Sequence, residues 1–268
     1  MPGGLRPGAV LGVLREFRAG DESGPLVVSG APALADGLRR ELGRDAAPGA
    51  VASQSLVGAA ALVHVLAAAP SGDDEAILRQ AERARIPAVV VVADPGIETR
   101  VPFVRATDVI RVPTGSGFPV DEVATAIARR LGDDGASLAA RVPAVREAVC
   151  EVLIERASRR NALLAVAVFV PGADLPVLTV NQLRLVLRIG AAHGVEIGQE
   201  RLPEVLAVVG SAFGFRALAR RLVAGVPVAG WALKGGVAYG ATRALGEAAV
   251  RYFASIATPP GAGSGAAR

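Results

Sequence analysis

The sequence predicts an α/β domain with a small, mainly parallel sheet and flanking helices, followed by an all-α helical domain. Short apolar segments alternate with amphipathic ones over the first half, as in a parallel sheet with crossover helices. Only helical periodicity remains in the second half. Residues 1–140 carry 14 arginines and 17 acidic residues, whereas residues 141–268 carry 15 basic and 8 acidic residues. We therefore predict an α/β domain over 1–135, a helical domain over 141–258 and a disordered Gly/Ala tail over 259–268.

The first half contains the clearest strand of the chain, the continuous apolar run Ala88–Val92, which is typical of a parallel strand covered on both faces. Ser71 precedes three acidic residues and predicts a capped helix start. In chain order we expect a helix over 10–18, a strand over 26–29, a helix over 33–42, an edge strand over 51–56, a strand over 61–66, a helix from Ser71 to about 84, strands over 88–92 and 108–112, and a helix over 121–131.

The second half contains three predicted helices. Thr179 and Gln182 have capping-box spacing and predict a helix start, and Gly194 predicts its end. A second helix is expected after Arg201, and a third from near Pro227 to Tyr252. Glycines recur four residues apart, which predicts close helix–helix contacts; the pairs are Gly190/Gly194, Gly210/Gly214 and Gly236/Gly240.

The order of elements in the first half resembles a P-loop GTPase domain. Arg85–Val92 resembles the strand that precedes the guanine-reading motif, and Val112–Phe118, followed by a helix from Asp121, resembles the last loop and helix. The resemblance implies a phosphate-binding loop after the first strand and a guanine-reading N-K-x-D after Val92.

Neither element is intact. A P-loop needs G-x-x-x-x-G-K-[ST], in which backbone N–H groups hold the phosphates and Ser/Thr holds Mg²⁺. The corresponding segment runs from Ser29 to Leu38 and has no lysine, and no Ser/Thr at the required position. Pro32 lacks an N–H, Asp36 adds a negative charge, and Gly37 follows it. The resemblance is therefore to a degenerate domain.

Asp94 is the one remnant of the guanine-reading motif, since valines stand where Asn and Lys belong. The alternative is that Asp94 makes a tight turn with Pro95 and Gly96. No cofactor is expected.

The helical half resembles the bacterial YcjF-type domain of unknown function that accompanies GTPases. The matching residues are Asn181, Gln182, Gly194, Arg201, Gly210, Gly214, Arg216, Pro227, Gly230, Trp231 and 242–252. Polar residues that helix packing does not demand are the candidates for partner contact: Gln182, Arg184, Arg188, Arg216, Arg220, Lys234 and Arg243.

Other chemistry is not indicated. His64, His193 and the single Cys150 are too few for a metal cluster, and the basic half has too few aromatic residues for a nucleic-acid surface. Composition and resemblance together predict a cytoplasmic, non-catalytic scaffold or regulatory protein whose partner is a protein, such as a related GTPase. Two alternatives stay open: an atypical GTP-binding protein, and a peripheral protein whose glycine-rich helices contact the anionic inner membrane face.

Overall fold

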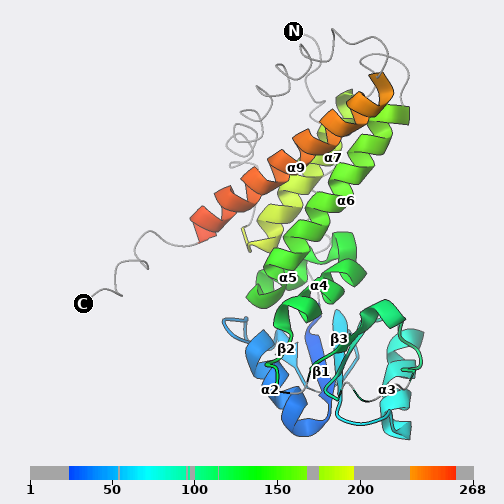
Figure 1. The fold of residues 1–268 in the computed structure, drawn as a ribbon. Helices are drawn as coiled ribbons and strands as arrows, with labels where there is room; N and C mark the ends of the chain where they lie inside the picture. Colours follow the sequence, from blue (N-terminus) through cyan, green and yellow to red (C-terminus); the bar gives the residue numbers. More distant parts are fainter. Residues whose placement is uncertain are drawn as a thin grey trace. The chain divides into compact units, whose positions relative to one another are not determined.

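The computed structural model describes residues 24–53, 55–94, 96, 100–113, 115–167, 175–195 and 230–257 (Figure 1). The chain divides into two compact units: one comprises Glu22–Val149, and the described part of the other begins at Cys150. The first is an α/β unit and the second is helical, which confirms the predicted fold class.

The α/β unit is built on a five-stranded parallel sheet in the order β2-β1-β3-β4-β5. The strands are β1 (Leu26–Gly30), β2 (Val51–Ala52), β3 (Ala61–Leu66), β4 (Ala88–Val92) and β5 (Val109–Arg111). Every residue of β4 is buried, which confirms the prediction of a strand covered on both faces, and every residue of β3 is buried as well.

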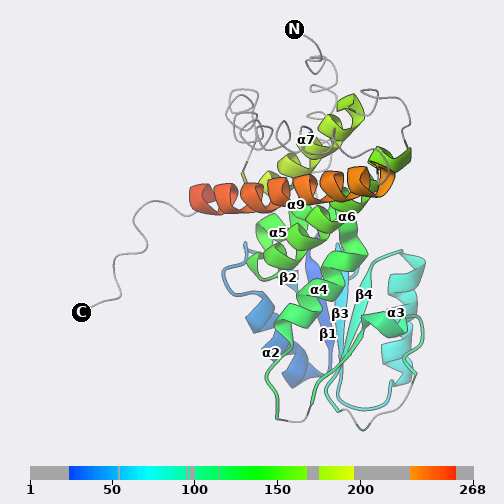
Figure 2. The same ribbon diagram turned by 45° about the horizontal axis from the view of Figure 1, so that its top comes forward.

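Helices cover both faces of the sheet (Figures 1 and 2). The connection from β1 to β2 and the connection from β3 to β4 run in opposite directions along the sheet. Because crossovers are right-handed, α2 (Pro32–Leu42) and α3 (Gly72–Arg83) lie on opposite faces. The α4 helix (Val120–Leu131) packs with α2.

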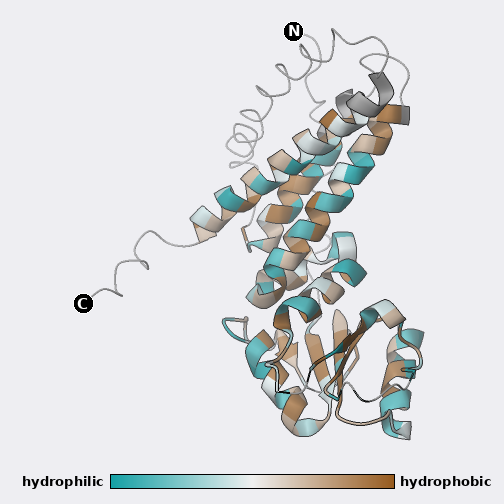
Figure 3. Cartoon of the chain, viewed as in Figure 1, coloured by the Kyte–Doolittle hydropathy of each residue, from teal (hydrophilic) through white to brown (hydrophobic). Residues whose placement is uncertain are grey.

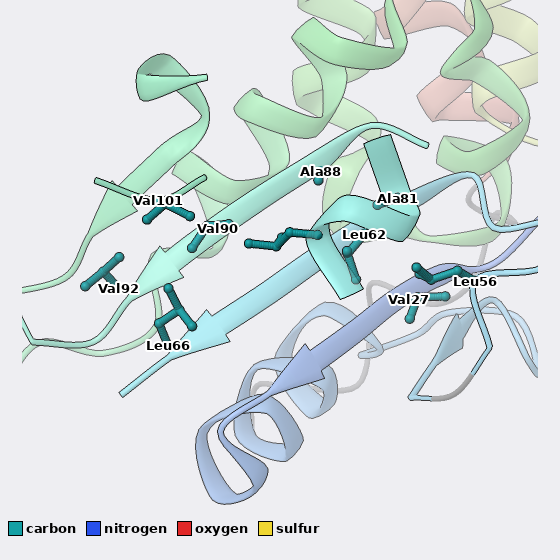
Figure 4. Close-up of a cluster of buried hydrophobic side chains, with 10 residues drawn as sticks. Val27, Leu56, Leu62, Leu66, Ala81, Ala88, Val90, Val92 and Val101 are labelled. Carbon is teal, nitrogen blue, oxygen red and sulfur yellow. The ribbon is translucent and has the colours of Figure 1, made fainter. Parts of the chain in front are cut away.

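One apolar cluster lies between α3 and the sheet (Figure 4). Its members alternate along each strand, as the period-two geometry of a strand requires. Leu78 and Ala81 of α3 pack there, and the loop residues Leu56 and Val101 close its margins. The remaining members are Val27, Leu62, Leu66, Ala88, Val90 and Val92.

Two predicted strands are shorter than expected. The edge strand ends at Ala52 because the chain turns at Ser55, whose φ is +58° and whose hydroxyl accepts a bond from the N–H of Val57. Leu56 is then buried as a loop residue. Asp108 belongs to the 3₁₀ turn η1 (Ala106–Asp108), so β5 begins one residue later than predicted.

Short helical turns follow α4: η2 (Gly132–Asp134), α5 (Ala136–Arg141) and η3 (Pro143–Val145). The helical unit contains α6 (Arg146–Ala167) from Cys150 onward, α7 (Leu175–Ala192) and α9 (Gly230–Ala257). Apolar and polar positions alternate around these helices (Figure 3). Within the described helices, none combines the length and the hydropathy needed to cross a bilayer.

The ends of α7 correct one prediction and confirm another. The helix begins at Leu175, so Thr179 lies inside it and is not its cap; Pro176 is tolerated because the first turn needs no N–H. Gly194 does terminate it, with φ +71°. Its N–H donates to Ala191 O at 2.8 Å, and that of Val195 donates to Gly190 O at 3.0 Å, the paired bonds of a Schellman motif.

The glycine prediction is wrong for the pair in α9. Gly236 and Gly240 are exposed, and apart from adjoining residues and the backbone of α9 no heavy atom of the described structure lies within 4 Å of a Cβ built on either. Close approach occurs instead at Gly246, where such a Cβ would lie 2.5 Å from Ile154 Cγ1 of α6. Gly210, Gly214 and the helices predicted over 10–18 and after Arg201 lie outside the described residues, as does the tail over 259–268.

Candidate functional site

The strand order reverses direction between β1 and β3, because β1 connects outward to β2 and β3 connects outward to β4. In open parallel sheets of this kind, ligands bind outside the carboxyl ends of the strands at the point where the order reverses. The segments that meet there are the start of α2, which follows β1, and the start of α3, which follows β3. We therefore take the carboxyl ends of β1 and β3 as the candidate site.

The connection from β1 to α2 is a single residue, Ala31. Gly30 has φ +107°, a backbone conformation that a side chain would strain, and it lets the chain turn directly from strand to helix. The N–H of Ala31 donates to Val65 O at 2.8 Å, and Pro32 at the first helical position has no N–H. The connection therefore has no run of free N–H groups of the kind that holds phosphates.

The other two residues of the degenerate loop belong to α2. Asp36 forms an ion pair with Arg39 at 2.9 Å, one helical turn away. Gly37 is buried against the ring of Phe118, which would lie 2.6 Å from an added Cβ. Both residues have structural partners within the α/β unit.

Asp94 follows β4 at the same edge of the sheet and is exposed. Its Oδ1 accepts a hydrogen bond from the N–H of Gly96 at 2.9 Å. A side-chain bond to the backbone two residues later is the bond of an Asx-turn. This geometry agrees with the tight-turn alternative for Asp94.

Three polar side chains form a continuous hydrogen-bonded chain at the candidate site. Ser29 Oγ lies 2.8 Å from His64 Nδ1, and His64 Nε2 lies 2.8 Å from Asp74 Oδ1. Ser29 and His64 are paired in register on β1 and β3, so their side chains share one face of the sheet. The ring of His64 is 2% exposed, whereas Ser29 is half-buried.

The helix start of α3 positions Asp74. Ser71 and Asp74 form a reciprocal capping box, in which Asp74 Oδ2 accepts the Ser71 N–H at 2.8 Å and the Ser71 hydroxyl at 2.7 Å. The carboxylate is thereby held with its second oxygen directed at His64. The sequence predicted this cap but gave no sign of its contact with His64.

The protonation state follows from the environment. Burial lowers the pKa of His64 and outweighs the hydrogen bond and charge of Asp74, which raise it. Burial would raise the pKa of Asp74, but hydrogen bonds from Ser71 and His64 leave that pKa below its usual value. Because an ionised carboxylate only accepts, His64 Nε2 carries the proton, and neutral Nδ1 accepts the Ser29 hydroxyl.

Sequence reasoning missed this constellation because its members lie in three separate segments. The hydroxyl and the ring are 35 residues apart and meet only when β1 pairs with β3. One signal was available: His64 is the only polar residue within an apolar run, and a buried histidine needs hydrogen-bond partners for its ring.

In the helical unit, Gln182 lies in a buried network rather than on an open surface. Gln182 Nε2 donates to Thr242 Oγ1 at 3.3 Å, and Asn161 Nδ2 donates to the same oxygen at 3.0 Å. Asn181 donates to Asn161 Oδ1 at 3.1 Å, and the Thr242 hydroxyl donates to Ala238 O. The network joins α6, α7 and α9.

Arg243 bridges α9 to α6 through ion pairs. It lies 2.9 Å from Glu151, 3.6 Å from Glu155 and 3.0 Å from Glu247. Tyr239 also donates to Glu155, and this bond lowers the carboxyl pKa, assisted by Arg159 and Arg243. Arg243 therefore has a structural role in joining the two helices.

The other interaction candidates lie in different parts of the chain. Arg184 and Arg188 lie half-buried on α7. Lys234 lies in the first turns of α9, and Arg216 and Arg220 lie outside the described residues. Within the described ranges, no group of three or more His, Cys, Asp or Glu side chains is placed to hold a metal ion.

Comparison with known protein families, curated proteins and solved structures finds no match to this chain.

Proposed function

We propose that this chain is a scaffold or regulatory protein that acts through protein contacts and does not bind or hydrolyse nucleotides. Its α/β unit is interpreted as a degenerate GTPase-like domain and its helical unit as a YcjF-type domain. The single-residue connection between β1 and α2 carries the proposal, because a phosphate cradle needs several free backbone N–H groups in succession.

Two further observations support the loss of nucleotide binding. Ala31 gives its N–H to Val65, so the connection could open only by breaking a bond at the end of the sheet. Asp94 is engaged with the N–H of Gly96, and valines precede it where a guanine site needs amide and ammonium groups. A nucleotide would therefore lack contacts at both of its ends.

The partner surface is assigned to the helical unit. Residues 141–268 carry a net charge of +7 in contrast to −3 for residues 1–140, which favours an acidic partner surface. Arg184 and Arg188 lie one helical turn apart on α7 and are partly exposed. A related GTPase is the proposed class of partner, in the cytoplasm or at the inner membrane face.

Titration calorimetry of the full chain with GTP and GDP in Mg²⁺ tests the first part, and we expect no binding heat. Micromolar affinity with defined stoichiometry would contradict it and favour the atypical GTP-binding alternative.

Partner capture tests the second part. The full chain with Arg184→Glu and Arg188→Glu should retain less of a related GTPase from the same cell than the parent does. Arg83→Glu, which changes an exposed arginine of α3, serves as the matched control. If the α7 variant and the control lost the same amount of captured GTPase, the assignment of the partner surface to α7 would be wrong. If the chain captured no GTPase but sedimented with anionic liposomes, the membrane alternative would be supported.

A further inference from the structure

The hydrogen-bonded chain of Ser29, His64 and Asp74 has the order of groups that activates a serine nucleophile. A hydroxyl donates to a neutral ring nitrogen, and the opposite ring N–H donates to a carboxylate, both at 2.8 Å. Such arrangements are recognised by geometry and roles rather than by sequence order, and they recur on unrelated folds. Here Nδ1 faces the serine and Nε2 faces the carboxylate.

We propose that Ser29 is a nucleophile for acyl transfer, with His64 as its general base and Asp74 as the group that orients and stabilises the ring. The proposal goes beyond the proposed partner-binding function and is independent of it. Loss of the phosphate loop removes one activity from this edge of the sheet and leaves the serine site untouched.

Position in the fold supports the assignment. Ser29 is the penultimate residue of β1, and His64 lies on β3, so both lie near the carboxyl ends of the two strands between which the order reverses. Pairing between β2 and β1 involves only Leu26 and Val27, so it stops before Ser29. Ser29 as a residue is half-buried rather than fully buried.

Neighbouring residues indicate the class of substrate. Ser29 is followed by Gly30 and Ala31, and the loop after β3 begins with Ala67, Ala68 and Ala69, all small and uncharged. The first turn of α3 carries Asp73, Asp74 and Glu75, which disfavour an anionic group near the serine. The site therefore suits an uncharged ester with a small acyl group.

The reaction balances without a cofactor. Ser29 Oγ attacks the carbonyl carbon and its proton passes to His64 Nδ1; the resulting imidazolium is stabilised by the Asp74 carboxylate. The tetrahedral intermediate expels the alcohol, which takes the proton from His64. Water then attacks the acyl-serine, gives a proton to His64, and releases the acid as Ser29 regains that proton.

A fluorophosphonate with a fluorescent reporter tests the nucleophile on the full chain. Ser29 Oγ would displace fluoride from phosphorus, and mass mapping should find one label per chain on Ser29. Ser29→Ala should abolish the label, whereas Ser53→Ala, at an exposed serine of the same unit, should not. Absence of label from Ser29 in the parent protein overturns the proposal.

The base is tested by the rate of labelling. His64→Gln should slow it about 100-fold or more, the usual contribution of general base catalysis. If circular dichroism shows that His64→Gln is unfolded, the rate is measured instead on Asp74→Asn, which removes the negative charge beside Nε2. A Ser29 labelling rate unchanged in the folded variant means that the chain of bonds is structural, and overturns the role of His64.

Discussion

The two units bury polar side chains in different places. In the α/β unit the buried polar residues of the described structure are His64 and Asp108, both ionisable, and both bound to partners near strand ends. In the helical unit they are neutral: Ser158, Asn161, Gln182 and Thr242, in the middle of α6, α7 and α9. The parallel sheet is apolar along most of its length, whereas the core between the helices contains the hydrogen-bonded amides of Asn161 and Gln182.

This difference follows from how a sheet and a helix each satisfy their backbone hydrogen bonds. In the sheet the backbone N–H and C=O groups pair between strands, so the side chains along the strands can all be apolar. Helices satisfy their backbones internally and can slide or rotate against one another, so directional side-chain bonds help to fix their register. The buried polar residue within the sheet, His64, therefore belongs to the candidate site, whereas the buried polar residues of the helices fix their alignment.

The largest expected effect tests the alignment role. Thr242→Val keeps the shape of the side chain but removes the acceptor for Asn161 and Gln182. A buried donor left without a partner costs about 1–3 kcal/mol, so we expect a loss of roughly 2–5 kcal/mol in the free energy of unfolding, measured by urea titration. Thr242→Ser retains the hydroxyl and is the control, expected to lose less stability; a loss in Thr242→Val no larger than that in Thr242→Ser would contradict the role of the network.

A smaller effect compares two glycines of α9. Gly246→Ala should destabilise the protein by about 1–3 kcal/mol, because its Cβ would overlap Ile154. Gly236→Ala should be neutral or stabilising by up to about 1 kcal/mol, since the position is exposed and alanine favours the helix. Thermal melts of the two variants measure the difference, and the same sign in both would contradict the packing seen here.

The smallest effect concerns the pH dependence of His64. Its folded pKa lies below the unfolded value, 6.5, so the unfolded state binds more protons in the interval between them. The stability contributed by the neutral ring is fully present above pH 6.5 and is lost as pH falls through the folded pKa. Urea titrations across that interval should show a steeper decline for the parent than for His64→Gln; parallel curves would mean that the ring does not titrate differently on folding.

Most of the α/β fold could be predicted because its signals are local. Ala88–Val92 and Ala61–Leu66 are strands with the predicted bounds, and Ser71 caps α3 as its acidic first turn indicated. The edge strand was overestimated since nothing in Val51–Leu56 reveals the turn at Ser55. The spacing of Thr179 and Gln182 fits a capping box, but Gln182 is buried within the helix interface and the helix begins at Leu175.

The candidate site could not be predicted in the same way. Ser29, His64 and Asp74 are ordinary strand and helix-start residues when read in sequence, and only the order of the strands brings them together. The same limit applies to the glycines of α9. Helical periodicity does not say which of Gly236, Gly240 and Gly246 faces a neighbour, because that depends on how α9 is rotated against α6.

The strand order also has a kinetic consequence. Only α3 and its short loops separate β3 from β4, whereas α2, β2 and a further loop separate β1 from β3. Closing the longer stretch costs more chain entropy, so we expect the pairing of β1 with β3 to nucleate more slowly than that of β3 with β4. Ser29 and His64 can form their hydrogen bond only when β1 is paired with β3. A chain in which β3, α3 and β4 had assembled without β1 would therefore lack this hydrogen bond.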